Sequence, residues 1–196
     1  MKRSAQTERV TTETTVKASL LIDGTGQCDV ATGIGFLDHM LELFTRHGFF
    51  DIAIKTEGDL HVDYHHTVED TAIVLGGLFS EALGQKMGIT RFGTFYVPMD
   101  EALVRSVVDL SGRSFFSYNA PENMDPMGAF SFQLVEEFLR AFTANAKMNL
   151  HIDVLKGKDA HHVAEGIFKS LARALDLATS RDVRLGDTVP STKGLL

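Results

Sequence analysis

Two short motifs in the sequence combine histidine and glutamate at a spacing that suits metal binding. The first is His65-His66-Thr67-Val68-Glu69, and the second is His161-His162-Val163-Ala164-Glu165. If each motif begins a helix, residues i and i+4 share one face, so the first histidine and the glutamate of a motif can bind one metal ion. The second histidine points roughly 100° further around the helix, so we expect it to serve a different metal ion.

The context of the two motifs is also repeated. Residues 37–83 are typical of a helix, a strand, a loop and a second helix, and residues 135–175 show the same order. Within these segments, residues 40–45 (Met-Leu-Glu-Leu-Phe-Thr) align with residues 138–143 (Phe-Leu-Arg-Ala-Phe-Thr). A lone His-His pair is more often a surface feature than a ligand pair, but two matched copies in a repeated frame favour metal ligands. We therefore predict an internal duplication of an α+β unit.

The duplication supplies two further candidate ligands, because His39 and Glu137 stand at corresponding positions. The predicted metal ligands are His39, His65, His66, Glu69, Glu137, His161, His162 and Glu165. One hypothesis divides them between two pseudo-equivalent sites. The first site would contain His65, Glu69, Glu137 and His162, and the second would contain His39, His66, His161 and Glu165. Nitrogen and oxygen ligands without a thiolate favour Mn²⁺ or Fe²⁺ over structural zinc.

Hydrophobic periodicity indicates the elements that must position these side chains. Alternation predicts a strand near residues 14–22, and a helix follows Gly33-Ile34-Gly35 and ends at His47-Gly48. The further strands are expected near residues 28–31, 50–56, 92–98, 103–110, 115–118 and 148–154, and the further helices near 65–83, 132–146 and 162–178. We predict one domain over residues 1–196, with repeats at about 7–90 and 91–180 and a non-periodic C-terminal tail at 181–196.

The bulk composition argues against several classes of partner and of structure. The net charge is −7, which disfavours nucleic acid and anionic membranes as partners through the bulk field. The single cysteine, Cys28, excludes an intrachain disulfide framework. The N-terminal residues lack the apolar segment of a secretory signal, and no apolar run is long enough to cross a membrane. These features predict a protein of the reducing cytoplasm.

Four segments resemble a known family, the imidazoleglycerol-phosphate dehydratases. They are residues 33–41 (Gly-Ile-Gly-Phe-Leu-Asp-His-Met-Leu), 63–70 (Asp-Tyr-His-His-Thr-Val-Glu-Asp), 158–165 (Lys-Asp-Ala-His-His-Val-Ala-Glu) and 190–194 (Pro-Ser-Thr-Lys-Gly). The resemblance covers nearly the whole chain, in the right order and spacing. Two positions depart from the family: Glu137 stands where many members have histidine, and Tyr64 stands where aspartate is common. Glutamate can also bind Mn²⁺, so we retain Glu137 as a ligand.

The resemblance implies a fold, a reaction and an assembly. The fold would be a duplicated α+β unit like domain 2 of ribosomal protein S5, with two similar halves in one domain. The enzyme would be a hydro-lyase of histidine biosynthesis that converts D-erythro-imidazoleglycerol phosphate to imidazole-acetol phosphate and water. Two Mn²⁺ ions per active site would hold the ring as an imidazolate, which expels the hydroxyl through a diazafulvene intermediate. Relatives assemble as homo-oligomers of twenty-four chains made from trimers.

The resemblance also implies roles for individual residues. Glu13, in Arg9-Val10-Thr11-Thr12-Glu13-Thr14, matches the family's proton-transferring glutamate, and Glu69 and Glu165 are grouped with it as catalytic residues. The phosphate-binding positions are Arg91, Arg113, Lys169, Ser191 and Lys193, where arginine suits a forked clamp and lysine supplies a point charge. The substrate-binding set adds Glu13, His39, His47, His65, His66, Glu69, His161 and Thr192. The C-terminal tail is expected to cover the substrate.

Two other functions fit the residues alone. A dinuclear metal hydrolase also uses histidine and glutamate, but its metal ions usually lie ~3.5–4 Å apart, whereas the adjacent histidines here favour separated ions. A metal-storing cage protein would need no phosphate clamp and no ordered tail. Thermal protection by a phosphate-bearing imidazole, abolished by truncation at Lys193, would discriminate the enzyme from the cage.

Overall fold

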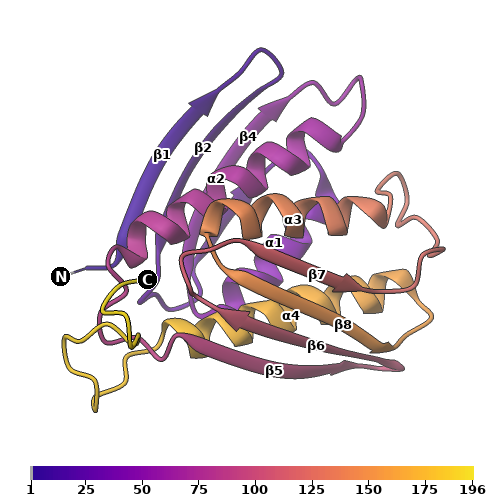
Figure 1. Cartoon of the computed structure of the whole chain (residues 1–196). Coiled ribbons are helices and arrows are strands. Elements are labelled where there is room, and N and C mark those ends of the chain that lie inside the picture. Colours follow the sequence, from indigo (N-terminus) through magenta and orange to yellow (C-terminus); the bar gives the residue numbers. More distant parts are fainter. Residues whose placement is uncertain (1) are drawn as a thin grey trace.

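The chain is built from two halves that repeat one order of elements, strand-strand-strand-helix-strand-helix (Figure 1). The computed structural model describes residues 2–196. The first half comprises β1 (Ser4–Val10), β2 (Thr14–Leu21), β3 (Cys28–Ala31), α1 (Gly35–Gly48), β4 (Asp51–Gly58) and α2 (His65–Leu83). The second comprises β5 (Phe92–Met99), β6 (Ala102–Asp109), β7 (Phe115–Asn119), α3 (Gln133–Ala146), β8 (Asn149–Lys156) and α4 (Ala160–Thr179).

The two sheets share one topology, which confirms the predicted duplication. The four-stranded sheets have the orders β1-β2-β4-β3 and β5-β6-β8-β7. In each sheet the first two pairings are antiparallel, and the last pairing, β3 with β4 or β7 with β8, is parallel. Each parallel pair is joined by a crossover helix, α1 or α3, as parallel strands require.

The helices cover one face of each sheet, and the two halves meet through them. The central strand β2 alternates buried and less buried residues, so one of its faces packs against α2, and β6 does the same against α4. Across the halves, α2 packs on α3 and α1 packs on α4 (Figure 1). The buried rings of Phe44 and Phe79 lie 6.0 and 5.5 Å from that of Phe142, so the aromatic core is continuous between the halves.

The first strand is an element that the sequence pattern did not indicate. β1 has the sequence Ser-Ala-Gln-Thr-Glu-Arg-Val, and Ala5 is its one buried residue. A polar edge strand has almost no alternation to detect, because only one side chain enters the core. Arg9 of this strand reaches α2, where its Nη1 lies 2.6 Å from the carboxylate of the buried Asp70.

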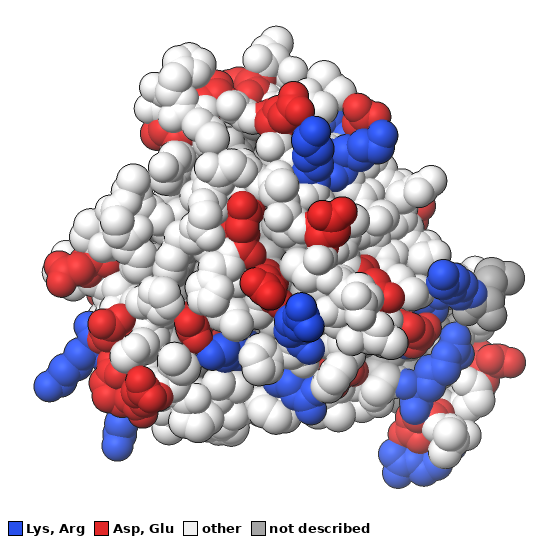
Figure 2. Space-filling model, turned by 180° about the vertical axis from the view of Figure 1, so that it is seen from behind, with Lys and Arg blue, Asp and Glu red and all other residues white. Residues whose placement is uncertain are grey.

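Charged side chains of both signs are mixed over the molecular surface. Figure 2 shows acidic and basic groups interspersed on one face, without a continuous basic patch. Binding of a phosphate group would therefore depend on local convergence of a few basic residues. None of the helices in the described part of the chain is long and apolar enough to cross a membrane.

Candidate metal centres and active site

Three predicted ligands converge between α1 and α4. His39 Nε2 and His161 Nε2 each lie 3.0 Å from Glu165 Oε1, and the three ligand atoms lie within 4.8 Å of one another. His161 and Glu165 are four residues apart on α4, so they share one face of the helix. His39 comes from the other half of the chain, and it reaches Glu165 because α1 packs on α4. This group of donors could hold one divalent cation.

The duplication places the counterparts of these ligands, His65, Glu69 and Glu137, on α2 and α3. His65 Nε2 lies 4.0 Å from Glu69 Oε2, again one helical turn apart. His65 and Glu137 line one cavity of about 600 Å³ between the two helices. Glu137 on α3 therefore takes the place that His39 has on α1. Each group draws ligands from both halves of the chain.

The second histidine of each motif contacts a carboxylate outside the ligand sets described above. His66 Nδ1 lies 2.9 Å from Asp59 Oδ2, and His162 Nδ1 lies 2.8 Å from Glu101 Oε2. These carboxylates raise the pKa of both histidines. Neither His66 nor His162 belongs to the group of donors that converges on Glu165. A single chain thus brings three predicted ligands together at Glu165, and it carries their counterparts His65, Glu69 and Glu137 on α2 and α3. The remaining predicted ligands, His66 and His162, lie at separate locations.

Opposing effects act on the buried carboxylate of Glu165. Its side chain is 9% exposed, and burial alone would raise its pKa. Hydrogen bonds from Lys169, His39 and His161 overcome that effect and lower the pKa to about 2. Glu165 is therefore ionised at neutral pH, which is the state that binds a metal ion.

Aspartates fix the start of both ligand-bearing helices. Asp159 Oδ1 accepts hydrogen bonds from the backbone N–H groups of His161 and His162 at 2.8 and 3.2 Å. Asp63 Oδ1 accepts from the backbone N–H of His65 at 2.8 Å. These contacts satisfy N–H groups that have no partner within the helix. They explain why both motifs begin at a helix N-terminus, as the sequence predicted.

Glu13 lies in the turn between β1 and β2, beside His66. The hydroxyl oxygen of Thr11 accepts from the backbone N–H groups of Glu13 and Thr14 at 3.2 and 2.9 Å and so fixes the turn. The Glu13 side chain is 49% exposed, and its Oε1 lies 3.8 Å from His66 Nε2. The predicted acid/base and a predicted metal ligand are thus adjacent.

His47 and Lys169 extend the α1–α4 group into a polar seam. Burial lowers the pKa of His47, and the positive charges of Lys169 and Arg173 lower it further. Lys169, one turn after Glu165 on α4, donates a hydrogen bond from its Nζ to Glu165 Oε2. In the first half the position that corresponds to Lys169 is occupied by Ile73. The two groups of ligands therefore have chemically different surroundings.

The other predicted phosphate-binding residues gather near the C-terminal end of α4. Arg91 Nε and Nη2 donate to Asp109 at 2.7 and 3.2 Å, and its Nη1 donates to the carbonyl of Pro190 at 2.8 Å. This contact holds the C-terminal tail at Pro190. Arg113, Thr192 and Lys193 are exposed, and Ser191 is half-buried. Lys86, which the sequence did not single out, is 5% exposed in this region, and burial lowers its pKa.

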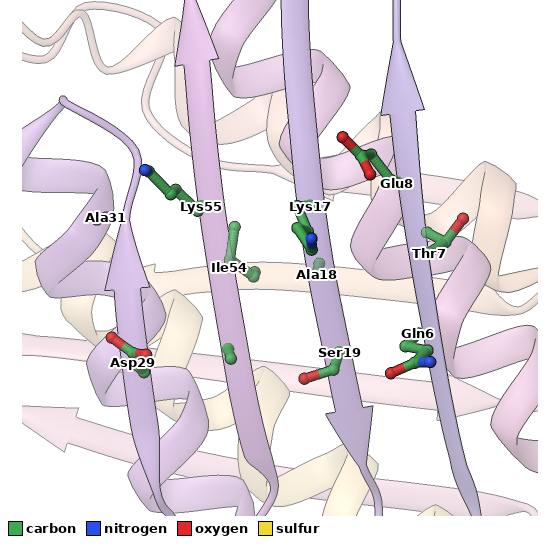
Figure 3. Close-up of a pocket in the computed structure, with 11 residues that line it drawn as sticks. Gln6, Thr7, Glu8, Lys17, Ala18, Ser19, Asp29, Ala31, Ile54 and Lys55 are labelled. Atoms are coloured by element: carbon green, nitrogen blue, oxygen red, sulfur yellow. The ribbon is translucent and has the colours of Figure 1, made fainter.

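A hollow of about 660 Å³ on the outer face of the first sheet contains none of the predicted site residues. Figure 3 shows its lining, in which Lys17, Lys55, Glu8 and Asp29 project from strands β1 to β4. Its charges are of both signs, and it holds no histidine. We therefore place the candidate chemistry at the helix-borne groups and not in this hollow.

Sequence reasoning missed Asp59 and Glu101, the two carboxylates that contact His66 and His162. Glu101 immediately precedes β6, as Glu13 immediately precedes β2. Extending the repeat alignment to these strands would have paired the two glutamates. Asp59 gives no such signal, because its counterpart in the second half is Gly157.

The fold and the sites together define a class of protein. A duplicated α+β domain that presents two groups of histidine and glutamate side chains is suited to bind two divalent cations through nitrogen and oxygen donors.

Comparisons with known proteins identify the family within that class. The sequence model of the family "Imidazoleglycerol-phosphate dehydratase" matches residues 32–175. The chain is 52% identical over 196 residues to the imidazoleglycerol-phosphate dehydratase of Granulibacter bethesdensis, covering 100% of both. The crystal structure of the Staphylococcus aureus enzyme is similar with 41% identity and a TM-score of 0.83, over 91% of this chain and 99% of that one. The crystal structure of the Pyrococcus furiosus enzyme in complex with (S)-C348 is similar with 34% identity and a TM-score of 0.84, over 97% of this chain and 100% of that one.

The chain belongs to the imidazoleglycerol-phosphate dehydratase family. It is a hydro-lyase of histidine biosynthesis that dehydrates imidazoleglycerol phosphate.

Proposed function

We propose that this dehydratase works with two Mn²⁺ ions per active site and that neighbouring chains complete each site. The observation that carries the proposal is the division of the eight predicted ligands. His39, His161 and Glu165 form one group, and their counterparts His65, Glu69 and Glu137 are carried by α2 and α3, with His65 and Glu137 lining one cavity. His66 and His162 lie apart from these groups, so they are available to a neighbouring copy of the chain.

The donors present fit the proposed metal. All eight are imidazole nitrogens or carboxylate oxygens, and Cys28 lies on β3, away from both groups. This set suits Mn²⁺, Fe²⁺ or a similar ion and does not resemble a thiolate zinc site. When bound, the ions would supply Lewis acidity at the nitrogens of the substrate's imidazole ring.

The distance between the metal ligands and the phosphate-binding residues of one chain supports an active site that is shared between chains. The backbone N–H of Arg91 donates to the carbonyl of Ala178, near the end of α4, whereas His161 lies at its start. At 1.5 Å per residue, seventeen residues of helix separate these points by roughly 25 Å. A ring joined to a phosphate by three carbons cannot span that distance, so Arg91 and His161 of one chain would serve different sites.

Each remaining residue has a role that its position suits. Glu13 is half-exposed next to His66, so it can move a proton to or from the substrate's carbon chain. Arg91, Arg113, Ser191, Thr192 and Lys193 would hold the phosphate, with the tail closing over it. His47 and Lys169, in the seam beside Glu165, would contact the substrate's hydroxyls or phosphate.

An assembly of twenty-four chains built from trimers is the form we propose. The outer face of the second sheet exposes Phe92, Tyr96 and Phe115, which supports association between copies. The single half-exposed thiol of Cys28 supports a reducing, cytoplasmic location. The continuous aromatic core supports one domain over residues 1–196.

Hybrid assemblies test the shared site. Chains carrying His161→Ala and chains carrying Lys193→Ala, with different affinity tags, would be coexpressed and purified through both tags. If one site combines His161 of one chain with Lys193 of another, random mixing gives about a quarter of the sites with both side chains intact.

Formation of the ketone product is the measurement, made on metal-stripped protein with and without added Mn²⁺. Each variant alone, taken through the same procedure, is the control and should stay inactive. Hybrids as inactive as the single variants would contradict shared sites, and turnover without added metal would contradict the Mn²⁺ requirement.

A further inference from the structure

A carboxylate contacts the same ring nitrogen of the second histidine in both halves. Asp59 Oδ2 lies 2.9 Å from His66 Nδ1, and Glu101 Oε2 lies 2.8 Å from His162 Nδ1. The two carboxylates do not come from corresponding positions. Asp59 follows β4, whereas Glu101 lies in the turn between β5 and β6, where the first half has Glu13. The two halves therefore place a carboxylate at the same ring nitrogen from different positions in the repeat.

A carboxylate at Nδ1 determines which nitrogen of a neutral histidine carries the proton. An ionised carboxylate only accepts hydrogen bonds, so it selects the form with hydrogen on Nδ1 and a lone pair on Nε2. Within residues 2–196, the carboxylates nearest to the Nε2 atoms are too distant for a hydrogen bond. They are Glu13, 3.8 Å from His66 Nε2, and Asp100, 3.7 Å from His162 Nε2. In both histidines Nε2 is thus left free to bind a metal ion.

Glu101 and Glu13 are held very differently, although they occupy corresponding turns. Glu101 Oε1 accepts from the backbone N–H groups of Lys158 and Asp159 at 3.1 and 2.9 Å, while its Oε2 faces His162. Within residues 2–196, no hydrogen bond to the Glu13 carboxylate is present. One copy of the duplicated glutamate is therefore fixed by three contacts, and the other is free to act on a substrate.

We infer that Glu101 and Asp59 are positioning residues, which fix His162 and His66 as Nε2 metal ligands, and that the duplicated glutamates have diverged. Glu13 serves proton transfer, and Glu101 orients a ligand. The metal-binding part of this inference rests on the proposed function. Loss of such a carboxylate partner typically weakens metal binding by about 10–100-fold.

Glu101→Gln gives a sharp test, because the structure dictates the orientation of the new amide. The two backbone donors require its oxygen at the Oε1 position, so its NH₂ group faces His162 Nδ1. A hydrogen-bond donor at Nδ1 favours the tautomer with hydrogen on Nε2. In that tautomer Nε2 has no lone pair with which to bind a metal ion. We expect His162 to change tautomer in metal-free protein and the affinity for Mn²⁺ to fall about 10–100-fold.

Asp59→Asn is the matched comparison. Asp59 Oδ1 is buried and has no hydrogen-bond partner within residues 2–196, so the asparagine can keep its oxygen toward His66. We expect the tautomer of His66 to be retained and Mn²⁺ affinity to fall less than in Glu101→Gln. Glu57→Gln, which replaces an exposed carboxylate paired only with Lys55, should change neither property.

Two measurements read out these variants. ¹⁵N NMR of histidine-labelled, metal-free protein reports the tautomers, with His162 assigned from a His162→Gln variant. Titration of free Mn²⁺ by electron paramagnetic resonance gives the affinity. An unchanged His162 tautomer or an unchanged affinity in Glu101→Gln would overturn the inference. If the wild-type protein bound no Mn²⁺, the proposed function would fail, while the tautomer would still decide whether Glu101 orients His162.

Discussion

At the scale of single residues, the same chemical group has different properties in the two halves. Glu165 is buried among Lys169, His39 and His161, which lower its pKa to about 2. Its counterpart Glu69 is half-buried and lies 4.0 Å from His65, with Ile73 in the place of Lys169. Lys169 would compete with a metal ion for Glu165, so we expect the two metal positions to differ in affinity.

The acid/base role of Glu13 is tested at this scale. Glu13→Gln removes an ionisable group that is half-exposed in a turn, 3.8 Å from His66 Nε2, and is not itself a predicted metal ligand. We expect turnover to fall by about 10²–10⁴-fold, because proton transfer is lost. Mn²⁺ affinity, measured by titration of metal-free protein, should stay within a small factor of wild type. A variant that kept normal turnover would remove Glu13 from the mechanism.

At the scale of elements, the sites depend on how closely the helices of the two halves approach. Gly76 on α2 faces the backbone of α3. A Cβ at Gly76 would lie 2.5 Å from the carbonyl oxygen of Phe142 and 3.0 Å from the backbone nitrogen of Ala146. Glycine therefore permits a close crossing of α2 and α3, the helices that carry His65 and Glu137.

Two neighbouring glycines provide a matched test of that crossing. Gly76→Ala must push the helices apart, and we expect it to lower the free energy of unfolding by about 1–3 kcal/mol. A Cβ at Gly77 meets no atom within 4 Å, so Gly77→Ala should raise the free energy of unfolding by about 0.5–1 kcal/mol through helix propensity. Urea denaturation of metal-free protein measures both. Equal effects of the two substitutions would show that close packing at Gly76 is unimportant.

At the scale of the whole molecule, metal binding and assembly should be coupled. The group at Glu165 presents three ligands from one chain, and the second histidine of each motif, His66 or His162, is located elsewhere. A metal ion that takes ligands from two chains holds those chains together, so its binding free energy also stabilises the assembly.

Metal removal tests this coupling. Treatment with a chelator should convert the large assembly to smaller species, and added Mn²⁺ should restore it, as followed by analytical ultracentrifugation. A His66→Ala, His162→Ala double variant should remain small even with Mn²⁺, because the bridging ligands are missing. An assembly that persisted unchanged in the absence of metal would show that protein contacts alone hold it.

Helices and buried strands were predictable from the sequence where one face is apolar. The alternation of Val16, Ala18 and Leu20 indicated β2, and the spacing of Val68, Ala72 and Leu75 indicated α2. β1 was not predictable, because a polar edge strand buries little and is defined by its hydrogen bonds to β2. The sequence thus predicted the elements that form the core better than those that only border it.

The sequence by itself determined the types of ligand, their one-turn spacing, the duplication and the family resemblance, because these are properties of residues close together in the chain. Tertiary structure decided which helices meet. His39 lies at Glu165 because α1 of one half packs on α4 of the other. It also decided that Glu101 would face His162 while its counterpart Glu13 stays free. Such contacts join segments far apart in sequence, and they depend on how side chains pack between helices and turns, which periodicity does not encode.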